Sequence, residues 1–158
     1  ANTAADPYYL VFLDGYGATG YDYALSANLI DVPNNATEAA SNDDSAAAQA
    51  LTALPYLVYE ASLSSATDED WFKYTATAAD VGKKLLIQTM GTDGQTDTVV
   101  AAFKSDGTSS LGESDDKSYH EVLTTAAIPA AGDIYIKVFA SDYFSTSHKK
   151  YELYVRLK

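Results

Sequence analysis

Oxygen-bearing side chains gather at two places in the first half of the sequence. Asp68 and Asp70 stand two residues apart at the start of an apolar run, where β-strand alternation turns both carboxylates to the same side. Asn42, Asp43 and Asp44 form a polar turn that can supply further oxygens. Hard oxygen ligands of this kind suit Ca²⁺, which takes roughly six to eight of them at flexible geometry. The alternative is that the turn acids are caps and that Asp68 and Asp70 form a solvated start of a strand.

A second set of acids is spread over predicted loops. None of them has the spacing of an EF-hand, which needs oxygens at alternating positions, a central glycine and a closing glutamate. Turn chemistry is the favoured interpretation, because Asp and Gly tolerate the backbone angles of tight turns. The set consists of Asp93, Asp97, Asp106, Glu113, Asp115 and Asp116.

Catalytic and nucleotide-binding patterns are weak. Residues 15–20 spell G-x-G-x-x-G after a strand-like run, but the following residues read as another strand rather than as the helix of a dinucleotide site, which favours a hairpin loop. The only histidines are His120 and His148, and neither a G-x-S-x-G elbow nor an H-E-x-x-H motif is present. We therefore expect no catalytic residues and no enzymatic activity.

Tyrosine is concentrated near the N-terminus. Five of the 13 tyrosines fall in residues 8–23, and Tyr16, Tyr21 and Tyr23 are the candidates for a ligand-binding platform. Tyrosine offers a large amphipathic contact area at low entropic cost, which suits sugar rings or a polypeptide. The alternative is that these side chains belong to the core and to strand edges.

The charge balance narrows the possible partners. The chain has 10 Lys and Arg against 22 Asp and Glu, for a formal charge of −12. Nucleic-acid affinity comes mainly from basic residues that neutralise phosphates, so no nucleic-acid partner is expected. Anionic membrane surfaces are disfavoured for the same reason, and no apolar stretch approaches the ~18 residues of a membrane span. Zero cysteine excludes disulfides and thiolate metal sites.

Short β-type runs separated by Gly, Asp, Asn and Ser dominate the chain. In residues 133–139 and 151–157 apolar and polar side chains alternate, which predicts strands with one buried face. The pattern predicts an all-β, antiparallel, jelly-roll-like sandwich of about seven to nine strands with at most one short helix. The other predicted strands are residues 8–13, 55–63, 70–77, 84–90 and 98–104.

Residues 34–54 do not follow the strand pattern. They are rich in Ala, Asn and Asp, and Ser41 or Asp44 is a suitable N-cap for a short helix at residues 46–51. An extended loop is the equal alternative. We expect a single domain over residues 1–158, in which residues 1–37 form a Tyr-rich extension that adds strands and residues 42–158 form the sandwich.

An ordered series of motifs runs from Asn42 to the C-terminus. It includes the Asn42-Asp43 turn, an Asp-x-Asp-aromatic-Phe strand at Asp68–Phe72, and a closing pair of strands. The series resembles the bacterial pre-peptidase C-terminal domain family, which is related to the collagen-binding domains of clostridial collagenases. Its segments here are residues 42–51, 68–75, 82–87, 97–99, 103–107, 114–116, 128–138 and 151–155.

The resemblance implies a non-catalytic accessory module that is secreted or displayed on the cell surface. Its ligand would be a polysaccharide or an extracellular protein, and its parent chain a larger secreted hydrolase. The alternative function is a structural domain of an exported peptidase or other hydrolase, without a ligand of its own. In the collagen-binding relatives Ca²⁺ is held by an Asn-Asp turn, by glutamates just upstream and by aspartates before the aromatic strand. Asn42, Asp43, Asp70 and Asp68 match that pattern, whereas the upstream glutamate is out of register and only Glu38 is near.

Overall fold

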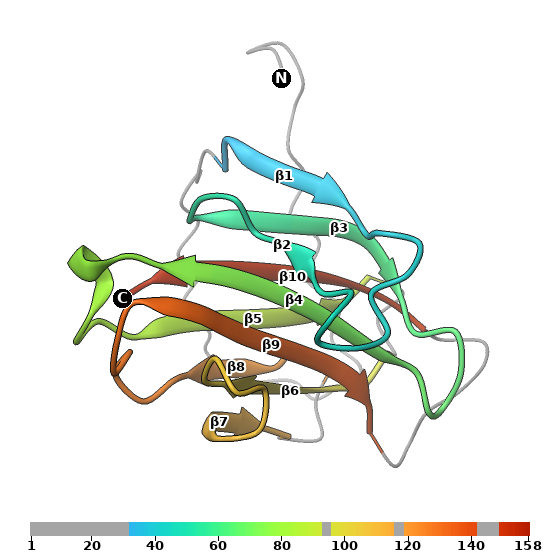
Figure 1. Ribbon diagram of the computed structural model, residues 1–158. Coiled ribbons are helices and arrows are strands. Elements are labelled where there is room, and N and C mark those ends of the chain that lie inside the picture. The colour runs from blue at the N-terminus through green and yellow to red at the C-terminus, as the bar shows by residue number, and fades with distance from the viewer. Residues whose placement is uncertain (1–31, 93–95, 116–118, 142–148) are drawn as a thin grey trace, which may run out of the picture. The chain divides into compact units, whose positions relative to one another are not determined.

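The computed structural model describes residues 32–92, 96–115, 119–141 and 149–158, which belong to one compact unit, Asp31–Lys158. These residues form ten β-strands and one short 3-10 helix, arranged as two five-stranded sheets packed face to face (Figure 1). The predicted all-β sandwich is confirmed. The predicted strand at residues 8–13 and the glycine-rich loop at residues 15–20 lie outside the described residues.

The first sheet has the strand order β1-β3-β10-β5-β8. Its strands are β1 (Asn34–Thr37), β3 (Tyr56–Ser62), β10 (Lys150–Leu157), β5 (Leu85–Gly91) and β8 (Val122–Thr124). The second sheet has the order β2-β4-β9-β6-β7. Its strands are β2 (Gln49–Ala50), β4 (Glu69–Ala76), β9 (Gly132–Ala140), β6 (Thr98–Phe103) and β7 (Ser110–Ser114).

The segment from β1 to β2 adds one edge strand to each sheet. β1 pairs in parallel with β3, and β2 pairs in parallel with β4, whereas the other described pairs are antiparallel. The helix alternative for residues 46–51 is wrong, and the extended alternative holds. The Leu51 N–H donates to the Lys73 carbonyl at 2.8 Å, so the sheet takes the hydrogen bonds that a helix would have made internally.

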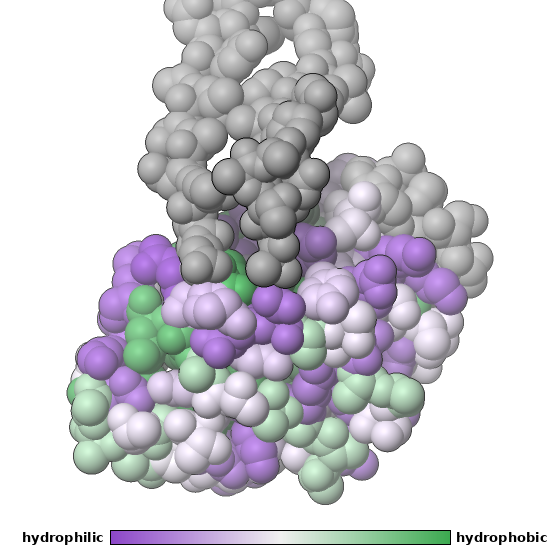
Figure 2. Space-filling view, turned by 90° about the horizontal axis from the view of Figure 1, so that it is seen from above, coloured by the Kyte–Doolittle hydropathy of each residue, from purple (hydrophilic) through white to green (hydrophobic). Residues whose placement is uncertain are grey.

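The core lies between the two sheets. Every second side chain of β9 and β10 is buried, as the alternation predicts, and Ile136, Leu153 and Val155 are fully enclosed. On the side seen in Figure 2, hydrophilic residues are mixed with weakly hydrophobic ones and a few strongly hydrophobic ones. In the part of the chain that the structure describes, no helix is long and apolar enough to cross a membrane.

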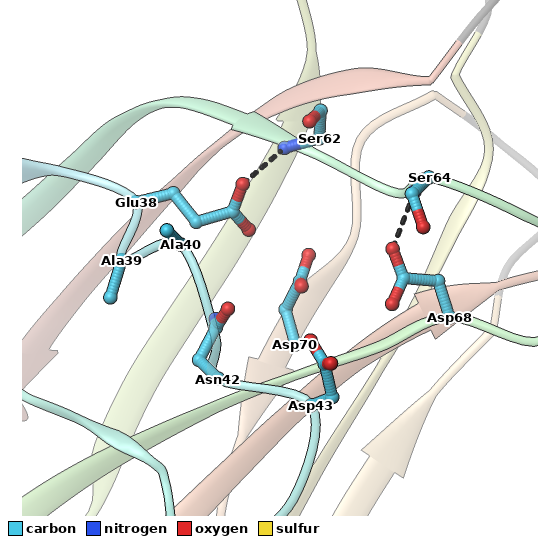
Figure 3. Close-up of a pocket in the computed structure, with 9 residues that line it drawn as sticks. All are labelled: Glu38, Ala39, Ala40, Asn42, Asp43, Ser62, Ser64, Asp68 and Asp70. Atoms are coloured by element: carbon cyan, nitrogen blue, oxygen red, sulfur yellow. Dashed lines mark hydrogen bonds between the residues drawn. The ribbon is translucent and has the colours of Figure 1, made fainter.

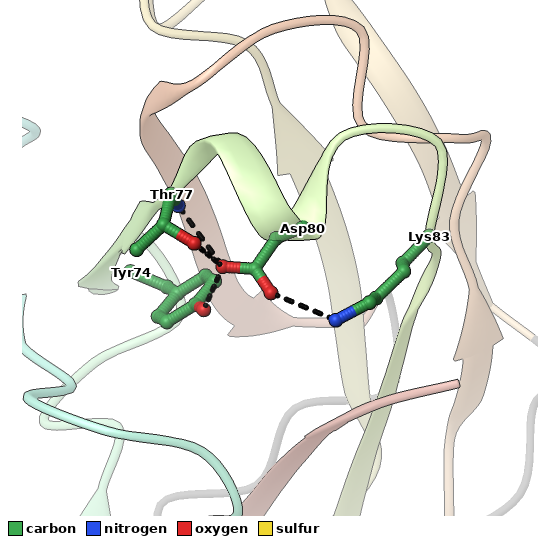
Figure 4. Close-up of polar contacts among 4 residues, drawn as sticks. All are labelled: Tyr74, Thr77, Asp80 and Lys83. Carbon is green, nitrogen blue, oxygen red and sulfur yellow. Dashed lines mark hydrogen bonds and ion pairs between the residues drawn. The ribbon is translucent and has the colours of Figure 1, made fainter.

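A carboxylate fixes the connection between β4 and β5, which contains the 3-10 helix η1 (Ala78–Asp80). Asp80 Oδ2 accepts hydrogen bonds from the Thr77 N–H at 2.9 Å, the Thr77 hydroxyl at 2.7 Å and the Tyr74 hydroxyl at 2.8 Å (Figure 4). Its Oδ1 lies 3.2 Å from Lys83 Nζ. The Thr77 donors, helped by Tyr74, hold the pKa of Asp80 well below its usual range.

Candidate functional site

A polar hollow of about 280 Å³ lies where the chain passes from β1 towards β2 and from β3 to β4. Figure 3 shows its carboxylates directed inward from these two connections and from β4. The side chains that line it are Glu38, Ala39, Ala40, Asn42, Asp43, Ser62, Ser64, Asp68 and Asp70.

Four of the five residues predicted as metal ligands come together here. Asn42, Asp43, Asp68 and Asp70 all line the hollow, so Asp68 and Asp70 do turn to the same space. Asp44 does not line it. Its Oδ1 accepts hydrogen bonds from the Ala46 and Ala47 N–H groups, both at 2.8 Å, which makes it a turn cap.

Asp70 is the most deeply placed acid of the hollow, with 2% of its surface exposed. The Tyr151 hydroxyl of β10 donates to Asp70 Oδ2 at 2.7 Å from the core side. Burial is the main cause that raises the pKa of Asp70 to about 8; the nearby carboxyls of Glu38 and Asp68 contribute to this rise, and the Tyr151 hydrogen bond opposes it. Asp70 is therefore a carboxyl that lacks enough positive charge to balance it.

Glu38, which follows β1, is the residue that the ligand prediction left out. Its Oε2 accepts a hydrogen bond from the Ser62 N–H at 3.0 Å, while its Oε1 is buried and finds no hydrogen-bond donor among the described residues. Burial raises the pKa of Glu38 as well. The family resemblance provided the signal that points to Glu38, since it places a glutamate upstream of the Asn-Asp turn.

Asn42 links the hollow to the second sheet. Its carbonyl accepts a hydrogen bond from the Trp71 N–H at 2.7 Å, and its side chain is buried. Within the described part of the chain, Asn42 Nδ2 has no acceptor. Because an amide presents either its oxygen or its nitrogen after a half-turn, this side chain can offer an oxygen ligand instead. On the opposite side of the hollow, Asp68 Oδ2 accepts from the Ser64 N–H.

The hollow is not a closed metal centre. Across residues 32–92, 96–115, 119–141 and 149–158, no three Asp, Glu or His side chains converge closely enough to hold a metal ion. A cation would therefore have to draw the carboxylates inward. The predicted platform of Tyr16, Tyr21 and Tyr23 lies outside the described residues and stays a prediction.

Comparison with solved structures shows what the fold resembles. The pre-peptidase C-terminal domain of a collagenase from Bacillus anthracis matches with a TM-score of 0.53 and 18% identity, over 69% of this chain and 94% of that chain. The fold likeness inferred from the motifs is thereby confirmed. At the level of sequence, no family model matches, and no curated protein does.

Two periplasmic inhibitors of g-type lysozyme match more loosely. The protein from Aeromonas hydrophila gives a TM-score of 0.44 at 13% identity, over 79% of this chain and 98% of that chain. The protein from Salmonella Typhimurium gives a TM-score of 0.36 at 16% identity, over 79% of this chain and 99% of that chain.

Proposed function

We propose that the chain is a non-catalytic accessory module that works outside the cell and is braced by Ca²⁺ in the acidic hollow. The observation that carries the proposal is the gathering of four carboxyls in one hollow, where Asp70 is buried and Glu38 Oε1 is a buried oxygen without a described hydrogen-bond donor. Buried acids without a compensating positive charge are costly, and a cation among them lowers that cost.

The donor set suits Ca²⁺ better than a transition metal. Glu38, Asp43, Asp68 and Asp70 supply carboxylate oxygens and Asn42 an amide oxygen, without histidine or cysteine in the lining. Ca²⁺ prefers such hard oxygen ligands and accepts irregular geometry, whereas Mg²⁺ requires a smaller, nearly octahedral site. When bound, the ion would supply the positive charge that balances these acids.

Calcium at this position would act as a structural brace. Glu38, Asn42 and Asp43 belong to the β1–β2 connection, Asp68 to the β3–β4 connection, and Asp70 to β4. An ion between them would tie the segment that supplies both edge strands to the sheets behind it. The likeness to a collagenase accessory domain supports a module of this kind, with a polysaccharide or an extracellular protein as ligand and a secreted hydrolase as parent.

The test is thermal unfolding of the full chain with Ca²⁺, with Mg²⁺ and with a chelator. A ligand that binds only the folded state stabilises it and so raises the melting temperature. At a ligand concentration a hundredfold above Kd, the free energy of unfolding increases by about 2.7 kcal/mol. We expect a rise with Ca²⁺ in the parent and in Asp44→Asn, whose carboxylate lies outside the hollow, and a much smaller rise in Asp68→Asn. If the parent melts at the same temperature in Ca²⁺ and in chelator, the brace does not exist.

One alternative shares the same fold: a structural domain of an exported hydrolase, without a ligand. It predicts that the isolated chain is stable and that it retains no polymer. Any effect of Ca²⁺ would then be on the stability of the chain and not on binding.

A further inference from the structure

The outward face of the second sheet carries an aromatic surface that spans three neighbouring strands. Trp71 of β4 stacks on Phe103 of β6 with ring centroids 5.7 Å apart, and it meets Tyr135 of β9 edge-on at 6.4 Å. The register explains this reach across the sheet. Trp71 is paired with Lys137, whose partner on β6 is the small residue Ala101, so the indole has room to lean over towards Phe103.

Two ion pairs border this aromatic surface along the strands. At one end Lys137 Nζ lies 3.1 Å from Glu69 Oε1, and Glu69 Oε2 also accepts from the Trp71 indole N–H at 3.2 Å. The same ammonium stands 4.4 Å from the ring centroid of Phe139. At the other end Lys73 Nζ lies 3.5 Å from Asp133 Oδ2. By the ~3.3 Å rise per residue, the four steps along the strand from Glu69 to Lys73 span roughly 13 Å.

The aromatic surface is fixed but not covered. Trp71 is nearly buried and forms its floor, whereas Phe103, Tyr135 and Phe139 are half-exposed. In the two ion pairs, the side chain of Glu69 is 41% exposed and that of Asp133 is 33% exposed. Side chains that are already held by ion pairs and ring contacts lose little freedom on binding, and this pre-organisation favours affinity.

The charge of this face differs from that of the chain. The outward positions of β4, β9 and β6 carry two lysines against one glutamate and one aspartate, and Glu113 of β7 stands beside Ala101 at the border, so the face is close to neutral on a protein of charge −12. A neutral face selects neither polyanions nor polycations, which leaves an uncharged polymer as the complementary partner. The half-exposed rings require that this polymer also has apolar flat surfaces.

We infer that this face binds a neutral glycan chain, and that the half-exposed rings of Tyr135 and Phe103 stack against its sugar rings. This inference rests on the proposed accessory-module function and names the ligand class for it. A β-1,4-linked chain fits, because its rings present flat C–H faces in an extended ribbon and its equatorial hydroxyls project sideways. The carboxylates of Glu69 and Asp133 accept hydrogen bonds from those hydroxyls, and the lysines donate to them.

A polypeptide fits this face less well. Extended peptides usually add to a free sheet edge, where unpaired backbone groups provide the hydrogen bonds. β9 is instead paired on both sides, with β4 and β6, so this region offers side chains only. The surface also continues past Asp133 into a hollow of about 270 Å³ lined by Lys104, Ser105 and residues 129–134, which extends the contact along the chain direction.

The test is a pull-down of the full chain with amorphous cellulose and colloidal chitin, with gelatin and hyaluronan as the protein and polyanion arms. The matched variants are Tyr135→Ala and Tyr154→Ala. Both are half-exposed tyrosines, one on the outward face of each sheet, so each variant removes the same kind of side chain from a similar position. We expect retention on at least one neutral glycan, a loss of affinity of about tenfold or more in Tyr135→Ala, and no loss in Tyr154→Ala. Circular dichroism and melting temperature confirm that both variants fold.

Three outcomes overturn the inference. The first is that neither glycan retains the parent. The second is that Tyr154→Ala loses as much affinity as Tyr135→Ala. The third is that gelatin or hyaluronan, instead of the glycans, retains the chain in a way that depends on Tyr135. The melting experiment with Ca²⁺ needs no polymer, so a failed calcium brace and a failed glycan face are distinguishable. Glu69→Gln provides an independent check in a variant that keeps all the rings. It replaces the carboxylate that accepts hydrogen bonds from sugar hydroxyls with an amide, which is a weaker acceptor, so we expect reduced retention.

Discussion

The hydroxyl of Tyr151 donates a 2.7 Å hydrogen bond to Asp70 Oδ2 and joins the last strand of the first sheet to β4 of the second. Tyr151 is fully buried and Asp70 is 2% exposed, so this bond crosses the interior of the sandwich. It connects the hydrophobic core to the acidic hollow. The aspartate that faces the candidate cation site is therefore held from behind by the core.

We predict that Tyr151→Phe lowers the free energy of unfolding by roughly 1–3 kcal/mol, because it leaves a buried carboxyl without its donor while the ring still fills the core. Urea denaturation measures the change. Tyr154→Phe is the control, since Tyr154 lies on the outward face of the same strand and is half-exposed. Equal losses in the two variants would show that the Tyr151 hydroxyl has no special role.

Calcium binding should depend on pH. The pKa of Asp70 is raised to about 8, so below that pH a proton competes with the cation for its carboxyl. A raised carboxyl pKa also means that the calcium-free protein loses stability as pH rises from the ordinary value of 3.8 towards about 8. Both effects make the calcium-induced rise in melting temperature larger at about pH 8 than at about pH 6.

Melting curves with and without Ca²⁺ across this pH range test the prediction. Asp70→Asn cannot titrate at this position and should show a smaller rise that depends less on pH, with Glu38 as the remaining acid of raised pKa. Asp44→Asn should follow the parent. A calcium-induced rise that stays constant with pH in the parent would contradict the role assigned to Asp70.

Strands long enough to show alternation were predictable. β9 and β10 run for nine and eight residues, and their buried side chains recur at every second position. The edge strands β1, β2 and β8 have four, two and three residues, which is too short for a period to be read. Their pairing depends on the neighbouring strand rather than on their own pattern, so the described residues alone form ten strands where about seven to nine were predicted for the whole chain.

The candidate site was predictable only in part. Asp68 and Asp70 lie close in sequence, and β-strand alternation suffices to bring them to one side. The contact between Glu38 and Ser62 spans 24 residues and depends on how β1 adds to the first sheet, which no local pattern contains. The aromatic surface could not be predicted from a local pattern either, because Trp71, Phe103 and Tyr135 come from three separate strands.

The Asp80 network should give acid sensitivity. Because the pKa of Asp80 is lowered in the folded protein, its stabilising effect is complete above the ordinary value of 3.8 and is lost as pH falls below it. We predict that Asp80→Asn lowers the melting temperature by several degrees at pH 7 and that the difference shrinks below about pH 4. Glu113→Gln, an exposed acid on β7, should differ little from the parent at either pH. A difference between Asp80→Asn and the parent that does not change with pH would contradict the ionised state of Asp80.

Gly91 closes β5 at a point where only a glycine fits. A Cβ built there would lie 2.6 Å from the Thr96 carbonyl oxygen and 3.0 Å from the Thr96 nitrogen, and both are backbone atoms that cannot rotate away. We predict that Gly91→Ala lowers the free energy of unfolding by roughly 1–3 kcal/mol, which is typical of overpacking. Met90→Ala is the control in the same strand, because Met90 is 51% exposed and its truncation should change stability by no more than about 0.5 kcal/mol. Urea denaturation of both variants decides the matter, and a Gly91→Ala protein as stable as the parent would show that the chain after β5 yields to accommodate the methyl group.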